Sequence, residues 1–306
     1  MKISRREFIG GVAATAVGDL APKALGAAVP DESFIDVWGA ENEQVRPEHY
    51  RAYMGTGENP NGFVALEKLE KGFDRVLAEV AETKVGDVPA VWLVYNMGVV
   101  VKTRKSLFSI DLVHRRATEL APKLDFALIS HNHSDHYTQD FYRAMDKAGK
   151  TVVNNFIDNY GAADWRKGGN YWENGGYVRG VKVFKLGDVE VRTSLTDHNP
   201  YLVDYTTAFE IRVGGWKMLH TGDCSNVDKL NPIWGRPDLW VQMPGCGIDN
   251  VAGERKIRPK LTAFGHFEEM GHGSGRVTPD FVRPRLAKVR AVGGTVVVPR
   301  WGERIV

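Results

Sequence analysis

The chain is poor in cysteine and has no large excess of charge of either sign. Only Cys224 and Cys246 occur in 306 residues, so a framework of several disulfides is excluded, although one bridge between the two stays open. Forty basic and 38 acidic residues leave a net charge of +2, which lacks the basic excess typical of nucleic-acid-binding proteins. Nucleic acid is therefore not an expected partner.

Histidine is also scarce, yet three of the nine histidines fall within six residues. His131, His133 and His136 occur with Asp135 in the run His-Asn-His-Ser-Asp-His, directly after the apolar segment 124–130. Imidazole nitrogen and carboxylate oxygen are ligands that suit zinc and related divalent ions. A strand that ends at this point would hold the side chains on a loop at a sheet edge. The run therefore predicts a metal site.

Four further candidate residues follow apolar, strand-like runs in the same way. They are Asp111 after 106–110, His198 after 189–195, Asp223 after 216–219 and His266 after 260–264. Gly222 permits a tight turn that presents Asp223. The last ligand position has a rival in His272, and we expect His266 to bind because it follows its apolar run directly. His220 is expected to be a core histidine that bonds to the backbone.

In this order the motifs resemble those of the metallo-β-lactamase superfamily, which has an Asp, then H-x-H-x-D-H, a lone His, an Asp and a final His. The resemblance runs from about Trp92 to the C-terminus and implies an α/β fold, a four-layer αββα sandwich. It also implies two metal ions at one edge of the paired sheets. By this resemblance His131, His133 and His198 bind one ion, and Asp135, His136 and His266 bind the other. Asp223 bridges the two ions. Asp111 is not a ligand and orients the ligand loop from outside the ligand set.

The resemblance implies a dinuclear metal-dependent hydrolase. Two bridged dications lower the pKa of a water molecule and stabilise the charge of the transition state. Zinc is the expected ion, and manganese or iron fit the same ligands. Asp135 and Asp223 are the expected catalytic carboxylates, and Asp135 is placed to orient the attacking hydroxide. His272, Tyr201 and Tyr205 are candidates for contact with the substrate.

The sequence narrows the substrate without naming it. His133 stands where the flavodiiron members of the superfamily carry Glu, and Asp223 stands where its true β-lactamases generally lack an Asp. These features favour a small ester, lactone or phosphodiester. Asn96-Met97-Gly98 together with Thr221-Gly222-Asp223-Cys224 is most similar to the branch that contains sugar-phosphate lactonases. Two alternatives stay open: an exported metal-binding protein with little catalysis, and a β-lactam hydrolase.

The N-terminal residues resemble a twin-arginine export signal. Ser4-Arg5-Arg6-Glu7-Phe8 matches S-R-R-x-F, and a stretch rich in glycine and alanine follows. We expect residues 1–28 to be a signal peptide that the twin-arginine translocase binds during export. Residues 29–306 would then form one domain that works in the periplasm or outside the cell. The stretch is too short and too rich in glycine to be a stable membrane anchor.

Hydrophobic periodicity outlines the remaining elements. Apolar residues at helical spacing predict an amphipathic helix over 64–83, and further helices are expected from near Thr138 and near Pro279. Residues 92–103 predict a hairpin, and residues 295–298 a last strand.

Two segments show no such periodicity. The chain up to about Pro60 is expected to wrap the domain without regular structure, as part of an N-terminal extension that reaches about residue 90. The aromatic, glycine-rich stretch from Asn159 to Trp172 either covers the substrate or holds down an irregular loop.

Overall fold

The structure is a computed structural model that describes residues 33–154, 170–171, 181–267, 269–272 and 277–306. All of the described elements belong to one compact unit, Ser33–Val306. The expected signal peptide lies outside the described residues, and so does the stretch from Asn159 to Trp172 except for the backbone of residues 170 and 171. Within the described part, no helix is both long enough and apolar enough to cross a membrane.

Two β-sheets share one large hydrophobic core. The first has six strands in the order β1-β2-β3-β4-β5-β6. Its strands are β1 Ala90–Tyr95, β2 Gly98–Lys102, β3 Leu107–Ile110, β4 Phe126–Leu128, β5 Thr151–Val153 and β6 Asn170–Tyr171. The second has seven strands in the order β13-β12-β11-β10-β9-β8-β7. Its strands are β7 Lys182–Leu186, β8 Val189–Thr196, β9 Thr206–Val213, β10 Trp216–His220, β11 Leu239–Gln242, β12 Leu261–Phe264 and β13 Val296–Val297.

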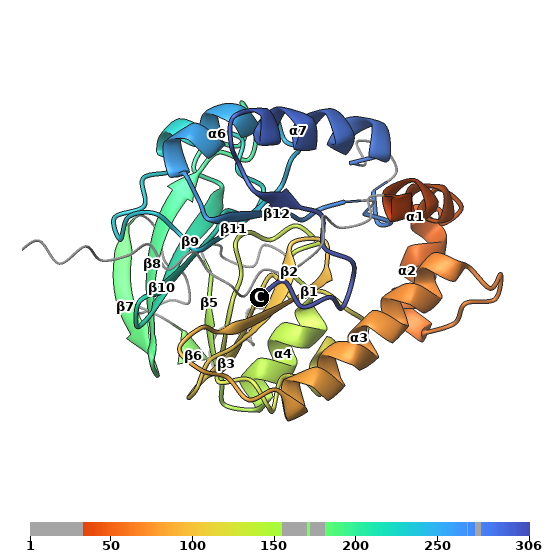
Figure 1. Ribbon diagram of the computed structural model, residues 1–306. Coiled ribbons are helices and arrows are strands. Elements are labelled where there is room, and N and C mark those ends of the chain that lie inside the picture. The colour runs from red at the N-terminus through yellow and green to blue at the C-terminus, as the bar shows by residue number, and fades with distance from the viewer. Residues whose placement is uncertain (1–32, 155–169, 172–180, 268, 273–276) are drawn as a thin grey trace, which may run out of the picture. The chain divides into compact units, whose positions relative to one another are not determined.

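Helices cover the outer face of each sheet (Figure 1). The described helices are α1 Ser33–Glu43, α2 Pro47–Thr56, α3 Val64–Glu82, α4 Gln139–Lys147, α6 Asn250–Ile257 and α7 Pro279–Ala291. Helix α3 contacts β1 and α4 contacts β5 in the first sheet, whereas α7 contacts β13 in the second. This is the predicted four-layer αββα sandwich.

Each sheet changes from antiparallel to parallel pairing partway across. Strands β1 to β3 are antiparallel, and β3 to β6 are parallel. In the second sheet β7 to β10 are antiparallel, and β10 to β13 are parallel. Strands β8, β10, β11 and β12 therefore all run in one direction, and their carboxyl ends lie at one edge of the sheet.

Most of the predicted elements are confirmed. Helix α3 buries its apolar stripe, including Leu69 and Phe73, and α4 begins after Thr138, whose Oγ1 accepts a hydrogen bond from the N–H of Phe141 at 3.4 Å. Helix α7 starts at Pro279. The predicted hairpin is β1 and β2, which turn at Asn96 with a φ of 55°.

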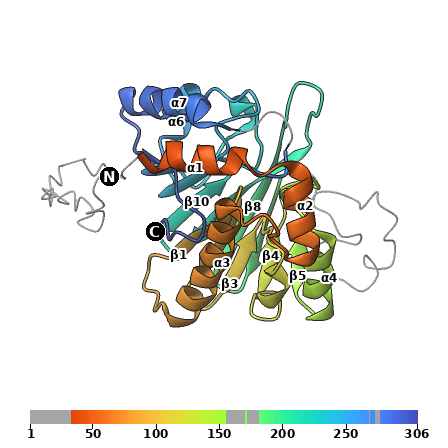
Figure 2. The same ribbon diagram turned by 90° about the vertical axis from the view of Figure 1, so that its right-hand side faces the viewer.

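The prediction that the chain up to about residue 60 lacks regular structure is wrong from Ser33 onward. Helices α1 and α2 occupy most of this segment, and Ile35, Trp38, Tyr50 and Tyr53 are buried. Figure 2 shows α1 lying between α3 and α7, and it contacts both. The apolar residues of α1 do not mark one face of the helix in the sequence, so tertiary packing rather than a strong local pattern stabilises it.

A buried histidine joins α3 to the segment that follows β3. The ring of His114 stacks on Phe73 with 4.0 Å between ring centroids, and its Nε2 lies 3.8 Å from Glu70 Oε2. Burial outweighs the attraction of Glu70 and lowers the pKa of His114 to about 4. His114 is therefore neutral in the folded protein at pH 7, whereas an unfolded chain binds a proton at this residue near pH 6.5.

We predict that His114 makes the protein less stable in mild acid. Because the pKa is lower in the folded state, the contribution of His114 to stability is complete above about pH 6.5 and is lost as the pH falls towards 4. The full loss is about 3 kcal/mol at ~1.4 kcal/mol per pH unit. Urea denaturation at pH 7.5 and at pH 4.5 measures how much unfolding free energy each protein loses between the two pH values. This loss should be smaller for His114→Gln than for the wild type. Equal losses in the two proteins would contradict the assignment.

Candidate metal centre

A buried carboxylate fixes the start of the histidine-rich loop after β4. Asp111 follows β3 with a φ of 49° and accepts hydrogen bonds from the N–H and the Oγ of Ser130, both at 2.6 Å. Its Oδ2 lies 2.9 Å from His136 Nδ1. Ser130 Oγ also lies 2.9 Å from His131 Nδ1. Each ring therefore keeps its Nε2 for another partner, because Nδ1 is engaged.

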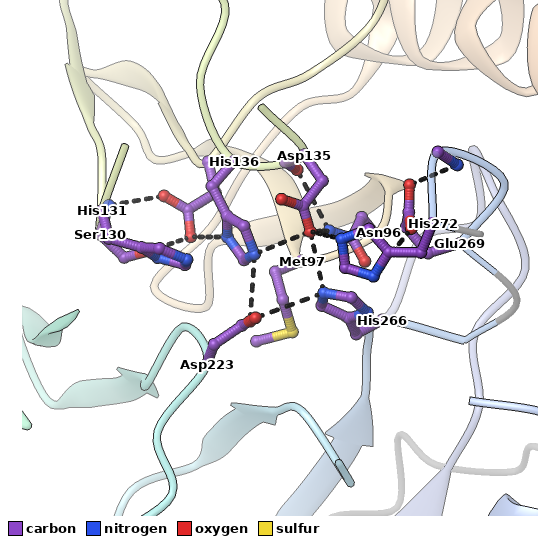
Figure 3. Close-up of polar contacts among 12 residues, drawn as sticks. Asn96, Met97, Ser130, His131, Asp135, His136, Asp223, His266, Glu269 and His272 are labelled. Carbon is purple, nitrogen blue, oxygen red and sulfur yellow. Dashed lines mark hydrogen bonds and ion pairs between the residues drawn. The ribbon is translucent and has the colours of Figure 1, made fainter. Parts of the chain in front are cut away.

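The predicted ligands form two groups at the carboxyl ends of strands from both sheets. The first group is His131, His133 and His198, and the second is Asp135, His136, Asp223 and His266. Within each group one ligand atom per residue lies within 4.8 Å of the others. Figure 3 shows the second group, whose members come from the loops after β4, β10 and β12.

Asp223 contacts members of both groups. Its Oδ1 lies 3.0 Å from His136 Nε2, and its Oδ2 lies 3.4 Å from His266 Nε2. The same Oδ2 is 3.4 Å from Nε2 of His198, in the first group. Gly222, just before it, has a φ of 49°, and a side chain there would meet Ser130 and Thr206. Glycine thus allows the turn that carries Asp223 to approach the loop after β4.

An asparagine in the β1–β2 turn holds the other carboxylate. The amide nitrogen of Asn96 donates to Asp135 Oδ2 at 2.9 Å and to the Asp135 carbonyl at 3.1 Å. The carbonyl of Asn96 accepts from the N–H of His266 at 3.0 Å. Asn96 therefore links two ligand loops. This role of Asn96 is not evident from the sequence, although asparagine is enriched at positive φ and marks the turn.

Several buried ligand atoms make no hydrogen bond of good geometry among the described residues, although His136 Nε2 and Asp223 Oδ1 face each other as an ion pair. These ligand atoms are His131 Nε2, His136 Nε2, His198 Nε2, Asp135 Oδ1 and Asp223 Oδ1. Buried polar atoms are costly when they are unsatisfied, and these converge on one place. Divalent cations would satisfy them, since imidazole and carboxylate are their usual ligands. The residues therefore fit a metal centre.

Electrostatics at the site point the same way. Burial lowers the pKa of His131 well below its usual range, so this ring is neutral. Burial raises the pKa of Asp223, but the stronger effect of His136 and His266 leaves it well below the usual range. The same carboxylate, with Asp135, outweighs the effect of burial on His136 and raises its pKa well above normal. Without a metal, protons on histidine neutralise the negative charge of the carboxylates. Bound metal ions would take the place of those protons.

Comparison with known proteins agrees with this geometry. Residues 99–241 match the family model described as the beta-lactamase superfamily domain. The matched segment includes the loops after β4, β8 and β10, which carry six of the seven predicted ligands. No curated protein matches the chain in sequence.

Solved structures share the fold of this chain at low identity. Igni18, a novel metallo hydrolase from Ignicoccus hospitalis, is 17% identical with a TM-score of 0.55, and the match covers 71% of this chain and 97% of that one. A possible metal-dependent hydrolase from Veillonella parvula is 12% identical with a TM-score of 0.55, covering 71% and 98%. CmlA, a diiron beta-hydroxylase from Streptomyces venezuelae, is 15% identical with a TM-score of 0.52, covering 72% of this chain but only 54% of its own. At these identities the likeness shows the fold alone.

The two candidates for the last metal ligand occupy different places. His266 is buried, and its Nε2 lies 3.0 Å from Asp135 Oδ2. The side chain of His272 is 41% exposed, and its Nε2 is 3.7 Å from the same oxygen. Its Nδ1 lies 3.3 Å from Glu269 Oε2, a carboxylate that is fully buried beside Tyr95. The structure thus puts His266 inside the second group and His272 on its solvent side.

The two tyrosines predicted near the substrate differ in the same respect. Tyr205 lies 5.3 Å from the ring of His133 and 6.0 Å from that of His198, and its hydroxyl donates to Asn132 Oδ1. Tyr201 is 92% exposed, so its side chain does not pack against the centre. The structure therefore brings Tyr205, and not Tyr201, to the metal-ligand groups.

His220 and the two cysteines also have clear positions. His220 is buried, and its Nε2 lies 2.8 Å from the carbonyl oxygen of Met97, which confirms a core histidine bonded to the backbone. Cys224 and Cys246 are both free, so the disulfide left open by the sequence does not form.

Proposed function

We propose that this protein is a dinuclear metal-dependent hydrolase that acts on a small ester, lactone or phosphodiester. The observation that carries the proposal is the position of Asp223, whose two carboxylate oxygens contact histidines of both ligand groups. A carboxylate with neighbours on both sides is suited to bridge two ions. The complete set of seven predicted ligands, gathered in two adjoining groups, supports catalysis over simple metal storage.

The residues of the chain have separate tasks in this proposal. Two bound dications would supply Lewis acidity and lower the pKa of water, so that hydrolysis needs no serine or cysteine nucleophile. Asp135, held by Asn96 through two hydrogen bonds, is placed to orient the attacking water. Asp111 and Ser130 fix the rings of His136 and His131, so the ligand loop is ordered before substrate arrives.

On the solvent side, His272 is the residue best placed to contact a substrate. Its ring is partly exposed, and Glu269 holds it from the buried side. A hydrogen bond from His272 to the leaving-group oxygen would fix the orientation of an ester or phosphodiester. Tyr205 borders the first ligand group beside His133, where it would limit the size of the substrate.

We propose zinc as the resident metal, because five of the seven proposed donors are imidazoles, which zinc commonly binds together with carboxylates. Iron and manganese accept the same donors, so metal analysis decides between them.

The experiment that tests this function is metal analysis of the purified protein, paired with hydrolysis assays on a lactone, an aryl ester and bis-p-nitrophenyl phosphate. About two metal ions per chain and turnover of any of these substrates are expected. The substrate that is cleaved then identifies the type of bond. Two ions without turnover would instead support a metal-binding protein with little catalysis, and adding a β-lactam to the panel tests the third alternative.

A further inference from the structure

One free cysteine lies against the metal centre. Cys246 belongs to the loop after β11, a strand that pairs with β10 on one side and β12 on the other. The loops after these two neighbours carry Asp223 and His266. Because the three strands are parallel, the loop with Cys246 reaches the same edge of the sheet, between two ligand loops.

The sulfur of Cys246 is close enough to share a cation with two predicted ligands. Its Sγ lies 3.8 Å from Asp223 Oδ2. Ligand atoms of Cys246, Asp223 and His198 all lie within 4.8 Å of one another, so the three could hold a metal ion. Nε2 of His198 is one of the buried atoms without a hydrogen-bond partner, and this group of three includes it.

The backbone at Cys246 has a conformation that favours glycine. Its φ is 54°, and glycines stand on both sides of it. A β-carbon at positive φ is strained, and such residues cluster at functional sites. A side chain that only filled space would not need this position, which glycine adopts freely. Cys224 differs, because it is buried and its thiol donates to a backbone carbonyl, that of Asn226 at 3.4 Å, whereas the Cys246 thiol donates to the predicted ligand Asp223.

We propose that Cys246 supplies a thiolate ligand to the ion bound by His198 and Asp223. The inference rests on the proposed metal centre and adds a sulfur donor to its nitrogen and oxygen ligands. The thiol proton is released to solvent as the sulfur–metal bond forms. Thiolate prefers zinc and cadmium to manganese, so Cys246 makes the centre selective among divalent ions.

Cobalt(II) tests this ligand directly, because thiolate coordination gives a charge-transfer band in the near ultraviolet. The full chain is loaded with cobalt as wild type, Cys246→Ser and Cys224→Ser, and cobalt content is measured for each. We expect the band in the wild type and in Cys224→Ser, and its loss in Cys246→Ser at unchanged cobalt content. Zinc affinity relative to manganese should also fall about tenfold in Cys246→Ser.

The possible failures separate the two proposals. Cobalt binding with the same spectrum in the wild type and in Cys246→Ser would overturn the thiolate ligand and leave the metal centre standing. Absence of cobalt binding in the wild type would overturn the centre itself, and the ligand with it.

A second measurement needs no variant of Cys246. X-ray absorption of the zinc-loaded wild type should show a sulfur neighbour at about 2.3 Å. Met97 carries another sulfur near the site, where Figure 3 shows its side chain between Asp223 and His266. The zinc-loaded Met97→Leu variant should therefore keep the sulfur signal. A zinc spectrum with nitrogen and oxygen neighbours alone would overturn the inference.

Discussion

Replacing Asp223 with alanine should lower the hydrolytic rate by about a thousandfold or more and reduce the metal content from two ions towards one. The rate is expected to fall because a single group that stabilises transition-state charge is worth about 10²–10³, and Asp223 also holds the two ligand groups together through His136, His198 and His266. Metal analysis by mass spectrometry and turnover of the best substrate measure the two effects.

Two companion variants make this result specific. Asp223→Asn keeps the shape of the side chain and removes its charge, so it should lose metal as Asp223→Ala does. Asp140→Ala removes a carboxylate that is 87% exposed on α4 and should change neither metal content nor rate. Two ions per chain and near-normal turnover in Asp223→Ala would refute the bridging role.

The ligand set could be predicted from the sequence because each ligand follows a strand. Apolar runs before His131, Asp223 and His266 correspond to β4, β10 and β12, whose carboxyl ends meet at one edge. A polar residue that directly follows such a run therefore lies at this edge, close to the other ligands. The fold could be predicted from the order of the elements, because alternating strands and helices can cover two sheets in only a few ways.

The supporting residues could not be predicted in this way, because their partners are distant in the sequence. Asn96 bonds to Asp135 only once strands β1 to β4 of the first sheet have assembled, and Cys246 approaches Asp223 only once β10 and β11 of the second sheet have paired. Glu269 was one of two adjacent glutamates on a polar loop, and nothing local indicates that its carboxylate is buried beside Tyr95. Such contacts depend on tertiary packing rather than on hydrophobic periodicity.

The N-terminal helices escaped prediction for a related reason. In α1, Ile35 and Trp38 are buried while Val37 is 55% exposed, so the apolar residues do not mark one face clearly. Trp38 packs edge-on against Phe267 and Trp301, which lie near the other end of the chain. The helix is therefore defined by contacts that only the complete fold provides.

Changing Asp111 to asparagine should weaken zinc binding by about 10–100-fold, although Asp111 belongs to neither ligand group. Its two oxygens accept from the N–H and the hydroxyl of Ser130 and contact the ring of His136. An amide can replace only one of these oxygens, so one hydroxyl or imidazole partner is left without its acceptor. The loss of a buried hydrogen bond should also cost about 1–3 kcal/mol of unfolding free energy.

The carboxylate of Asp188 provides the matched control for this variant. It accepts hydrogen bonds from Ser106 Oγ at 2.6 Å and Thr103 Oγ1 at 2.9 Å, and it belongs to neither ligand group. Asp188→Asn should therefore lose stability without losing zinc affinity. Competition with a chelator gives the affinities, and urea denaturation of the metal-free proteins gives the stabilities. If Asp111→Asn binds zinc as tightly as Asp188→Asn does, Asp111 supports only the fold, and the orientation of His136 must come from the metal itself.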